Sequence, residues 1–396
     1  MNICSVVLAR PDVIRGGTER TVWELSKSLN KKGNNVHIVY SSAYTRSFPS
    51  EDVKQGVYLH GVKGVIAHPF PLLEKVSFNL KVIKVLREIR DRYAIDIIAF
   101  HGPYPLISLI LSRKYLFPTP LVYHTYAALP SEFEGVLKSP GSLWHKMAMC
   151  IRYGFDTLIE KRGIRMIDAL IVYSHQAMRE ILSYYGYPKE KIFVIHAGGF
   201  INQSAVSFTP SVFAKKAKNV LLFIGNDWHR KGLRVLFLAL RKVLKKFQNT
   251  ILIVIGSSDR SFLKIPEKLG IKDNVIFTGK INEDKKLYEY YASCDIFVLP
   301  SFHEGFGIPI IEAMSFGKPI IATKVAAIPE LVEHGKSGLL VNPGDPEGLS
   351  SAIVSLLSDN SLYKFMSRNA FERSKLFTWD KCADRILEIY KLIIHR

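Results

Sequence analysis

The chain has 396 residues, of which 48% are hydrophobic, and its 54 Lys and Arg against 35 Asp and Glu give a formal net charge of +19. This length predicts two domains, and the hydrophobic content excludes a largely disordered chain. The charge surplus, which leans to the N-terminal half, favours anionic partners: phosphates, acidic lipid surfaces or nucleic acid.

Four scattered cysteines without CxxC spacing argue against a disulfide framework or a zinc site and fit a reducing compartment. The sequence contains no run of about 18 uncharged apolar residues that would cross a membrane. The N-terminus lacks the basic region and long apolar core of a signal peptide. We therefore expect a cytoplasmic location, either in solution or peripherally at the inner face of a membrane.

The first half of the chain alternates strand-like and helix-like segments. A buried strand is predicted at Ile3–Leu8, followed by a glycine turn at Arg15–Thr18 and a helix over Glu19–Lys32 that Gly33 ends. Further strands are predicted at Val36–Tyr40, Asp96–Phe100, Pro120–Tyr123, Ala169–Tyr173 and Lys191–Ile195. This order is typical of a parallel sheet with crossover helices.

The segment Ser139–Ile167 mixes Trp, Met, Phe, Leu and Ile with Lys and Arg at near-helical spacing. Such a pattern fits an interfacial helix that lies on a membrane. It equally fits a long domain helix with a solvated basic face, and the sequence leaves both interpretations open.

The second half repeats the strand–helix alternation. Strands are predicted at Asn219–Gly225, Thr250–Gly256, Asn274–Thr278, Asp295–Pro300 and Pro319–Thr323, with helices at Gly232–Phe247 and from Pro309. Two such series imply two Rossmann-like parallel-sheet domains with ligand sites at the carboxyl ends of strands. We predict an N-terminal domain at 1–200, a linker at 201–217, a C-terminal domain at 218–376, and a helix within 377–396 that returns to the first domain.

The segment Ser301–Thr323, SFHEGFGIPIIEAMSFGKPIIAT, carries the most specific signal. Gly305 and Gly307 permit close backbone approach, and the free N–H groups at the start of the following helix attract a phosphate. Glu304 and Glu312 can face the same crevice and accept hydrogen bonds from sugar hydroxyls. For an isolated pair of glutamates, a helix start with two solvent-facing side chains is the simpler interpretation.

The full pattern resembles the signature of the retaining glycosyltransferases of family 4, with two glutamates separated by seven residues and Gly-Phe-Gly between them. This resemblance implies the GT-B architecture, in which two Rossmann-like domains face each other across a cleft. It implies that Glu304 touches the donor sugar and that Glu312 binds the ribose hydroxyls. It places Gly305, Phe306 and Gly307 against the sugar and the diphosphate.

The resemblance extends over nearly the whole chain. Gly16 and Gly17 are similar to the family's N-terminal glycine turn, whose amides approach the donor phosphates. His124, in VYHT, is similar to the strand-end histidine that contacts the reacting sugar, and His101 fits the other family histidine position less well. Lys231, in RKGL, corresponds to the lysine that neutralises the diphosphate leaving group. Taken singly, each has a plain structural alternative: a strand–helix connection, a structural histidine or a solvated lysine.

Two departures from the family pattern stand out. Asn226 occupies the position where the family usually has Arg, which removes a charge from the phosphate loop, and Arg230 is a nearby substitute. Ala326–Ala327 stands where a glycine pair is common, which affects the local loop shape. The segments GNDWHRKG and GGTER resemble the lipopolysaccharide-core glucosyltransferase branch of the family.

The resemblance implies that a hexose moves from a UDP- or GDP-sugar to a glycan or lipid-linked acceptor with retention at the anomeric carbon. No Asp-x-Asp stands in the expected donor cleft and no cluster has metal spacing, so we expect neither a metal nor a cofactor besides the donor. Lys231, Arg230 and main-chain amides then meet the charge of the leaving group. His124 orients the donor sugar.

Two other classes of function are consistent with parts of the sequence. A sugar-nucleotide 2-epimerase of the same fold would interconvert UDP-sugars without an acceptor. A non-catalytic nucleic-acid-binding protein is suggested only by the sequence pI of about 9.6. It would carry clustered aromatic and basic residues on a groove or sheet, a motif that the sequence does not show, so we expect no nucleic-acid partner.

Overall fold

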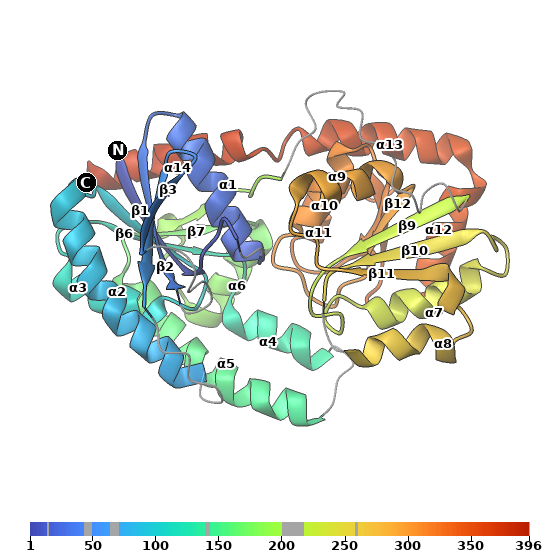
Figure 1. Ribbon diagram of the computed structural model, residues 1–396, viewed down its shortest axis with the longest axis horizontal. Helices are drawn as coiled ribbons and strands as arrows, with labels where there is room; N and C mark the ends of the chain where they lie inside the picture. The colour runs from blue at the N-terminus through green and yellow to red at the C-terminus, as the bar shows by residue number, and fades with distance from the viewer. Residues whose placement is uncertain are drawn as a thin grey trace. The chain divides into compact units, whose positions relative to one another are not determined.

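The computed structural model describes residues 1–13, 16–42, 50–63, 71–138, 143–199, 218–257 and 260–395. It divides into two compact units, the first formed by Met1–Ser131, Ala148–Gly198 and Trp379–Arg396 and the second by Glu132–Met147 and Gly199–Thr378 (Figure 1). The predicted linker 201–217 lies outside the described residues. Among these residues, no helix is both long and apolar enough to cross a bilayer.

The first unit is built on an eight-stranded sheet with the order β3-β4-β2-β1-β5-β6-β7-β8. Its strands are β1 Asn2–Ala9, β2 Asn35–Ser41, β3 Glu51–Lys54, β4 Val57–Val62, β5 Ile97–His101, β6 Leu121–Thr125, β7 Ala169–Val172 and β8 Ile192–Val194. All neighbours pair in parallel except the edge strand β3, which is antiparallel to β4. Parallel strands require crossover connections, which helices provide.

Helices cover both faces of this sheet. They are α1 Gly17–Lys31, α2 Pro71–Tyr93, α3 Leu106–Tyr115, α4 Leu129–Lys138, α5 Leu143–Gly163, α6 His175–Tyr185 and α14 Trp379–Ile394; the division into units falls within α4 and α5. Helix α14 packs along α1, and Lys32 Nζ pairs with Asp384 Oδ1 at 2.6 Å (Figure 1). The prediction that the C-terminal helix packs on the first domain is confirmed.

The second unit has a six-stranded, all-parallel sheet in the order β11-β10-β9-β12-β13-β14. Its strands are β9 Asn219–Ile224, β10 Thr250–Ile255, β11 Val275–Gly279, β12 Ile296–Leu299, β13 Ile320–Thr323 and β14 Gly338–Val341. Its helices are α7 Leu233–Val243, α8 Ile265–Lys268, α9 Asp284–Ser293, α10 Ile308–Ser315, α11 Ile328–Leu331, α12 Pro346–Ser358 and α13 Asn360–Ser374. Figure 1 shows α7 and α8 on one side of this sheet and α9 and α10 on the other.

In each unit the chain reverses its direction of winding at one place in the sheet. The reversal falls between β1 and β5 in the first unit and between β9 and β12 in the second. Ligands of open α/β sheets bind outside the carboxyl ends of the strands at such a reversal. The loops that follow these four strands are therefore where a site is expected.

A buried histidine pair joins β2 to β4 in the first unit. His37 Nδ1 lies 3.1 Å from His60 Nε2, and the ring of His37 stacks on Tyr58 with a centroid separation of 4.6 Å. Burial lowers the pKa of His37 to about 4, and burial also lowers the pKa of His60. Both rings are therefore neutral at pH 7.

Candidate active site

The centre of the second unit's candidate site is an ion pair at the β9/β12 reversal. Lys231 lies in the loop after β9, and Glu304 lies in the loop after β12. The ammonium and carboxylate groups are in contact, and their side chains are only 10% and 9% exposed. Ser301 Oγ donates to the same carboxylate at 3.4 Å. Because a buried charge is costly unless it is paired, this pair marks a site held ready for a charged ligand.

A second cation, Arg230, stands beside the pair. Its Nη1 donates to the carbonyl oxygen of His303 at 2.9 Å, and its Nε donates to Asp227 Oδ2 at 3.2 Å. Burial alone would raise the pKa of Glu304, but Lys231 and Arg230 outweigh burial and hold that pKa below its ordinary value. The carboxylate is therefore ionised, with two cations within its field.

The two loops touch through their main chains. The N–H of Phe302 donates to the carbonyl oxygen of Arg230 at 2.8 Å. Gly232 has a φ of +71°, and a Cβ added there would lie 2.0 Å from the carbonyl oxygen of Pro300. Only glycine permits this approach, which keeps the loop of Lys231 against the loop of Glu304.

Asn226, the residue that departs from the family pattern, bridges to the loop after β10. Its Oδ1 accepts a hydrogen bond from the N–H of Ser257 at 3.1 Å. A Cβ added at Gly256, whose φ is +123°, would lie 2.2 Å from the carbonyl oxygen of Gly225. Asn226 thus helps to hold the loop after β9 against the loop after β10. The positive charge beside Lys231 comes from Arg230.

The signature helix α10 begins directly after Gly307, which has a φ of +105°. Glu312 is completely buried, and its Oε2 accepts a hydrogen bond from the hydroxyl of Tyr291 at 2.8 Å. Phe306 is 2% exposed and packs edge-on against Phe377, so its ring belongs to the core and the main chain is what this position presents to the loop. Gly305 is half-buried in the same loop.

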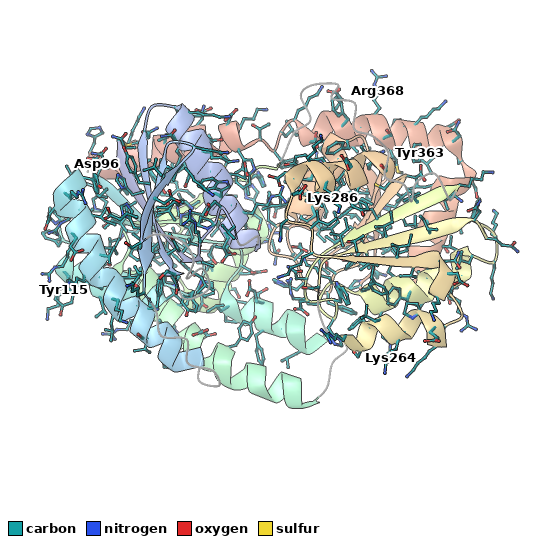
Figure 2. All side chains as sticks on the ribbon, in the orientation of Figure 1. Asp96, Tyr115, Lys264, Lys286, Tyr363 and Arg368 are labelled. Atoms are coloured by element: carbon teal, nitrogen blue, oxygen red, sulfur yellow. The ribbon has the colours of Figure 1, made fainter. Side chains whose placement is uncertain are left out.

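A pocket of about 460 Å³ lies at the carboxyl end of β11 and the start of α9. Phe277 and Thr278 of β11 line it together with Lys280, Glu283 and Lys286. Lys286 projects from α9 and is labelled in Figure 2. The size of this pocket, and its combination of an aromatic wall with polar groups, suit a small organic ligand.

In the first unit, the glycine turn leads into α1 from the end of β1. A Cβ added at Gly16 would lie 2.1 Å from Glu19 Oε2, so glycine leaves room for this carboxylate at the start of the helix. Burial raises the pKa of Glu19. Gly17 is the first residue of α1, and a Cβ added at Gly102, after β5, would lie 3.5 Å from the Thr18 side chain.

The two predicted histidines of the first unit lie side by side. The rings of His101 and His124 stack with a centroid separation of 4.3 Å at the ends of β5 and β6. His124 is 1% exposed, and both of its ring nitrogens are occupied: Nδ1 lies 2.9 Å from the hydroxyl of Tyr173 and Nε2 lies 2.9 Å from that of Tyr390. Its ring therefore belongs to a buried network rather than to an open surface.

These buried rings predict acid sensitivity of the folded protein. Burial lowers the pKa of His101 to about 3 and that of His37 to about 4, whereas both rings have a pKa near 6.5 in the unfolded chain. Below pH 6.5 the unfolded chain therefore takes up protons that the folded chain does not. The free energy of unfolding should fall by up to about 1.4 kcal/mol per pH unit for each ring.

Urea unfolding at pH 7.0, 6.0 and 5.0 measures this loss. The unfolding free energy should fall less steeply with decreasing pH in His37→Phe, which keeps an aromatic ring beside Tyr58 but cannot be protonated. An unfolding free energy that stays constant from pH 7 to pH 5 would contradict the assignment of neutral buried rings.

Three polar partners in these networks were not predicted from the sequence. Tyr173 ends the predicted strand Ala169–Tyr173, so the rule that places polar groups at strand ends would have found it. Tyr291 and Tyr390 lie within helices, where nothing in the sequence pattern separates them from ordinary core residues. Only the packing of α9 and α14 brings their hydroxyls to Glu312 and His124.

Two parallel-sheet units, each with polar loops at its reversal point and one with a buried Lys–Glu pair, define a glycosyltransferase of the GT-B class. Residues 15–198 match the family model described as Glycosyltransferase Family 4, and residues 208–373 match Glycosyl transferases group 1. The chain is 30% identical to a glycosyltransferase of Methanocaldococcus jannaschii over an alignment of 414 positions, gaps included, which covers 99% of this chain and 98% of the relative. The chain belongs to the family 4 glycosyltransferases.

Solved structures share the fold. Sucrose-phosphate synthase from Thermosynechococcus elongatus superimposes with a TM-score of 0.84 at 19% identity, covering 100% of this chain and 99% of that one. Anabaena HepE, in a complex with UDP-glucose, gives a TM-score of 0.75 at 21% identity and 99% coverage of both chains. WaaG, a glycosyltransferase of lipopolysaccharide biosynthesis, gives a TM-score of 0.74 at 17% identity over 98% of this chain and 99% of that one.

Proposed function

We propose that this glycosyltransferase moves a hexose from a UDP- or GDP-sugar to a glycan or lipid-linked acceptor, with retention at the anomeric carbon and without a metal ion. The observation that carries the proposal is the buried Lys231–Glu304 pair at the β9/β12 reversal, beside the start of α10. The complex of HepE with UDP-glucose supports a nucleotide-sugar donor for the same fold.

The ion pair suggests how the donor enters the site. A diphosphate carries more negative charge than one carboxylate and would compete with Glu304 for Lys231 and Arg230. Once Lys231 turns to the phosphates, the Glu304 carboxylate is available to accept hydrogen bonds from hydroxyls of the donor sugar. The N–H groups at the start of α10 add positive potential for the same phosphates.

The remaining donor contacts are proposed from where the candidate residues lie in the two units. The pocket at the end of β11 would hold the nucleoside, because it lies on the same carboxyl edge of the sheet as the ion pair. Glu312 would bind the ribose hydroxyls once its carboxylate exchanges its contact with Tyr291. The amides at Gly16 and Gly17 would approach the donor phosphates. His124, with His101 beside it, would bind the sugar once a sugar hydroxyl replaces one of the two phenols on its ring.

Departure of the nucleoside diphosphate leaves its negative charge beside Lys231 and Arg230, which are fixed in place before the reaction. Preorganised charge of this kind lowers the barrier without any rearrangement at the moment of reaction. The leaving phosphate would itself accept the proton of the acceptor hydroxyl on the same face of the sugar. This front-face route retains the anomeric configuration without an enzyme nucleophile.

The acceptor proposal depends on charge and on α5. The net charge of +19 favours an anionic surface, and Phe155 and Leu158 of α5 are 43% and 70% exposed. Exposed apolar side chains next to basic residues are typical of helices that lie on anionic lipid. We therefore propose peripheral binding to a membrane that presents the acceptor.

The test is nucleotide release by the purified protein from a panel of UDP- and GDP-sugars, with and without membrane extract. Release that depends on the extract, persists in EDTA and yields a product with the donor's anomeric configuration is the expected result. Sedimentation with anionic vesicles in the same samples should be lost at high salt. Loss of turnover in EDTA would contradict the metal-free proposal, and interconversion of UDP-sugars without extract would identify an epimerase instead.

A further inference from the structure

The geometry around His124 assigns a role to the C-terminal helix. A neutral imidazole has one N–H donor and one bare nitrogen acceptor. Because Tyr173 and Tyr390 each place a hydroxyl 2.9 Å from one ring nitrogen, one phenol accepts from the ring and the other donates to it. The two phenols together fix both the orientation and the tautomer of the ring.

The two phenols come from different kinds of element. Tyr173 directly follows β7, and its ring stacks on Tyr126 with a centroid separation of 4.5 Å. The hydroxyl of Tyr126 in turn contacts that of Thr21 on α1, so this side of His124 is held by the sheet and its first helix. The residue that contacts Nδ1, Tyr173, thus belongs to the core of the first unit.

Tyr390 instead belongs to α14, the last helix of the chain. It is 1% exposed, and its ring meets His124 edge-on with an interplanar angle of 83°. The chain enters α14 at Trp379, directly after the second unit ends at Thr378. The hydroxyl on Nε2 is therefore supplied by a helix of the first unit that follows the second unit in the sequence.

We propose that Tyr390 is a positioning residue for the transfer reaction, acting through His124. The proposal rests on the proposed function, in which a hydroxyl of the donor sugar replaces the phenol of Tyr173 at Nδ1 of His124 while Tyr390 keeps its contact with Nε2. Tyr390 itself touches no substrate. It holds the ring against rotation, so that the docking of α14 becomes a requirement for turnover in addition to its contribution to folding.

The prediction is made for the hydroxyl alone, in Tyr390→Phe. Removing one buried hydrogen bond to the ring should lower kcat about fivefold. The dissociation constant for the free nucleoside diphosphate should not change, because this ligand lacks the sugar that His124 is proposed to orient. The matched control is Tyr363→Phe on α13 (labelled in Figure 2), which removes a partly buried phenol hydrogen bond to the carbonyl oxygen of Asp295 at 3.2 Å and should leave kcat unchanged.

A double-mutant cycle separates positioning from general stability. We expect His124→Asn to show reduced but measurable turnover. In that background Tyr390→Phe should cause no further loss, because the group through which it acts is gone. Nitrogen NMR of histidine-labelled protein provides a second readout: His124 should show one neutral tautomer at pH 7, and Tyr390→Phe should shift its ring nitrogens.

Each result decides something. An unchanged kcat in Tyr390→Phe, or the same fractional loss in both backgrounds, would overturn the positioning role. Unshifted ring nitrogens in Tyr390→Phe would overturn the contact itself. A wild-type protein that releases nucleotide from no sugar donor would instead contradict the proposed function, so the two failures are distinguishable.

Discussion

Lys231→Ala is expected to lower kcat/KM by about 10³-fold, because it removes the buried cation that meets the charge of the leaving diphosphate. It also leaves Glu304 buried without its ion-pair partner, which should lower the free energy of unfolding by up to about 3 kcal/mol. Initial rates with the best donor and urea unfolding of the same preparation measure both effects. A matched control is Lys318→Ala, whose ammonium donates to the carbonyl oxygen of Ala292 at 2.8 Å in the same unit.

The double variant Lys231→Met, Glu304→Gln separates the two effects. It removes both charges together, so the buried carboxylate is no longer left unpaired and most of the lost stability should return. Activity should not return, because neither group can then meet the donor. Turnover close to that of the wild type in Lys231→Ala would exclude Lys231 from the donor site and with it the proposed route of charge stabilisation.

The fold was largely predictable because its strands are buried apolar runs that end at polar or glycine residues. Strands such as Ile3–Leu8 and Thr250–Gly256 agree with β1 and β10 within a residue or two. Three strands were not predicted, namely β3, the largely buried β4 and β14. β3 has no buried residue, and β14 is a four-residue strand that begins at Gly338, where an added Cβ would lie 2.2 Å from the carbonyl oxygen of Ile320.

The site residues were predictable where they follow strands and unpredictable where they depend on helix packing. Parallel strands place their carboxyl ends at one edge, so Lys231 and Glu304 could be expected to meet after β9 and β12. Tyr390 lies within a helix, and only the docking of α14 brings it to His124. Sequence periodicity identifies the buried face of such a helix. It does not identify which buried hydroxyl on that face meets a hydrogen-bond partner.

Burial explains the other differences between expectation and structure. The two glutamates of the signature were expected to face one crevice, yet Glu312 is completely enclosed beside Tyr291 and Glu304 is paired with Lys231. A sequence reports which charges are present but not which of them neutralise each other before a ligand arrives. The structure therefore holds both carboxylates in internal contacts, which the proposed donor would have to replace.

Gly232→Ala should be the most disruptive single-methyl substitution at the site. The added Cβ would lie 2.0 Å from the carbonyl oxygen of Pro300, a main-chain atom that cannot rotate away, and it would also strain a residue whose φ is +71°. The loop of Lys231 must then separate from the loop of Glu304. A shift of about 1 Å between reacting groups can cost about 10²-fold in rate, and we expect a loss of that order.

Gly270→Ala isolates the contribution of the contact from that of backbone strain. Gly270 has nearly the same φ, +68°, but no atom of the described residues would lie within 4 Å of its added Cβ. It should lose only about 1 kcal/mol of unfolding free energy and keep full activity, because strain alone costs roughly that much. Gly232→Ala should lose more than about 3 kcal/mol, since the clash adds to the strain. Equal losses in the two variants would show that the contact between the loops contributes nothing, whereas a large difference, accompanied by loss of turnover only at Gly232, would establish that the close approach of the two loops holds Lys231 and Glu304 in register.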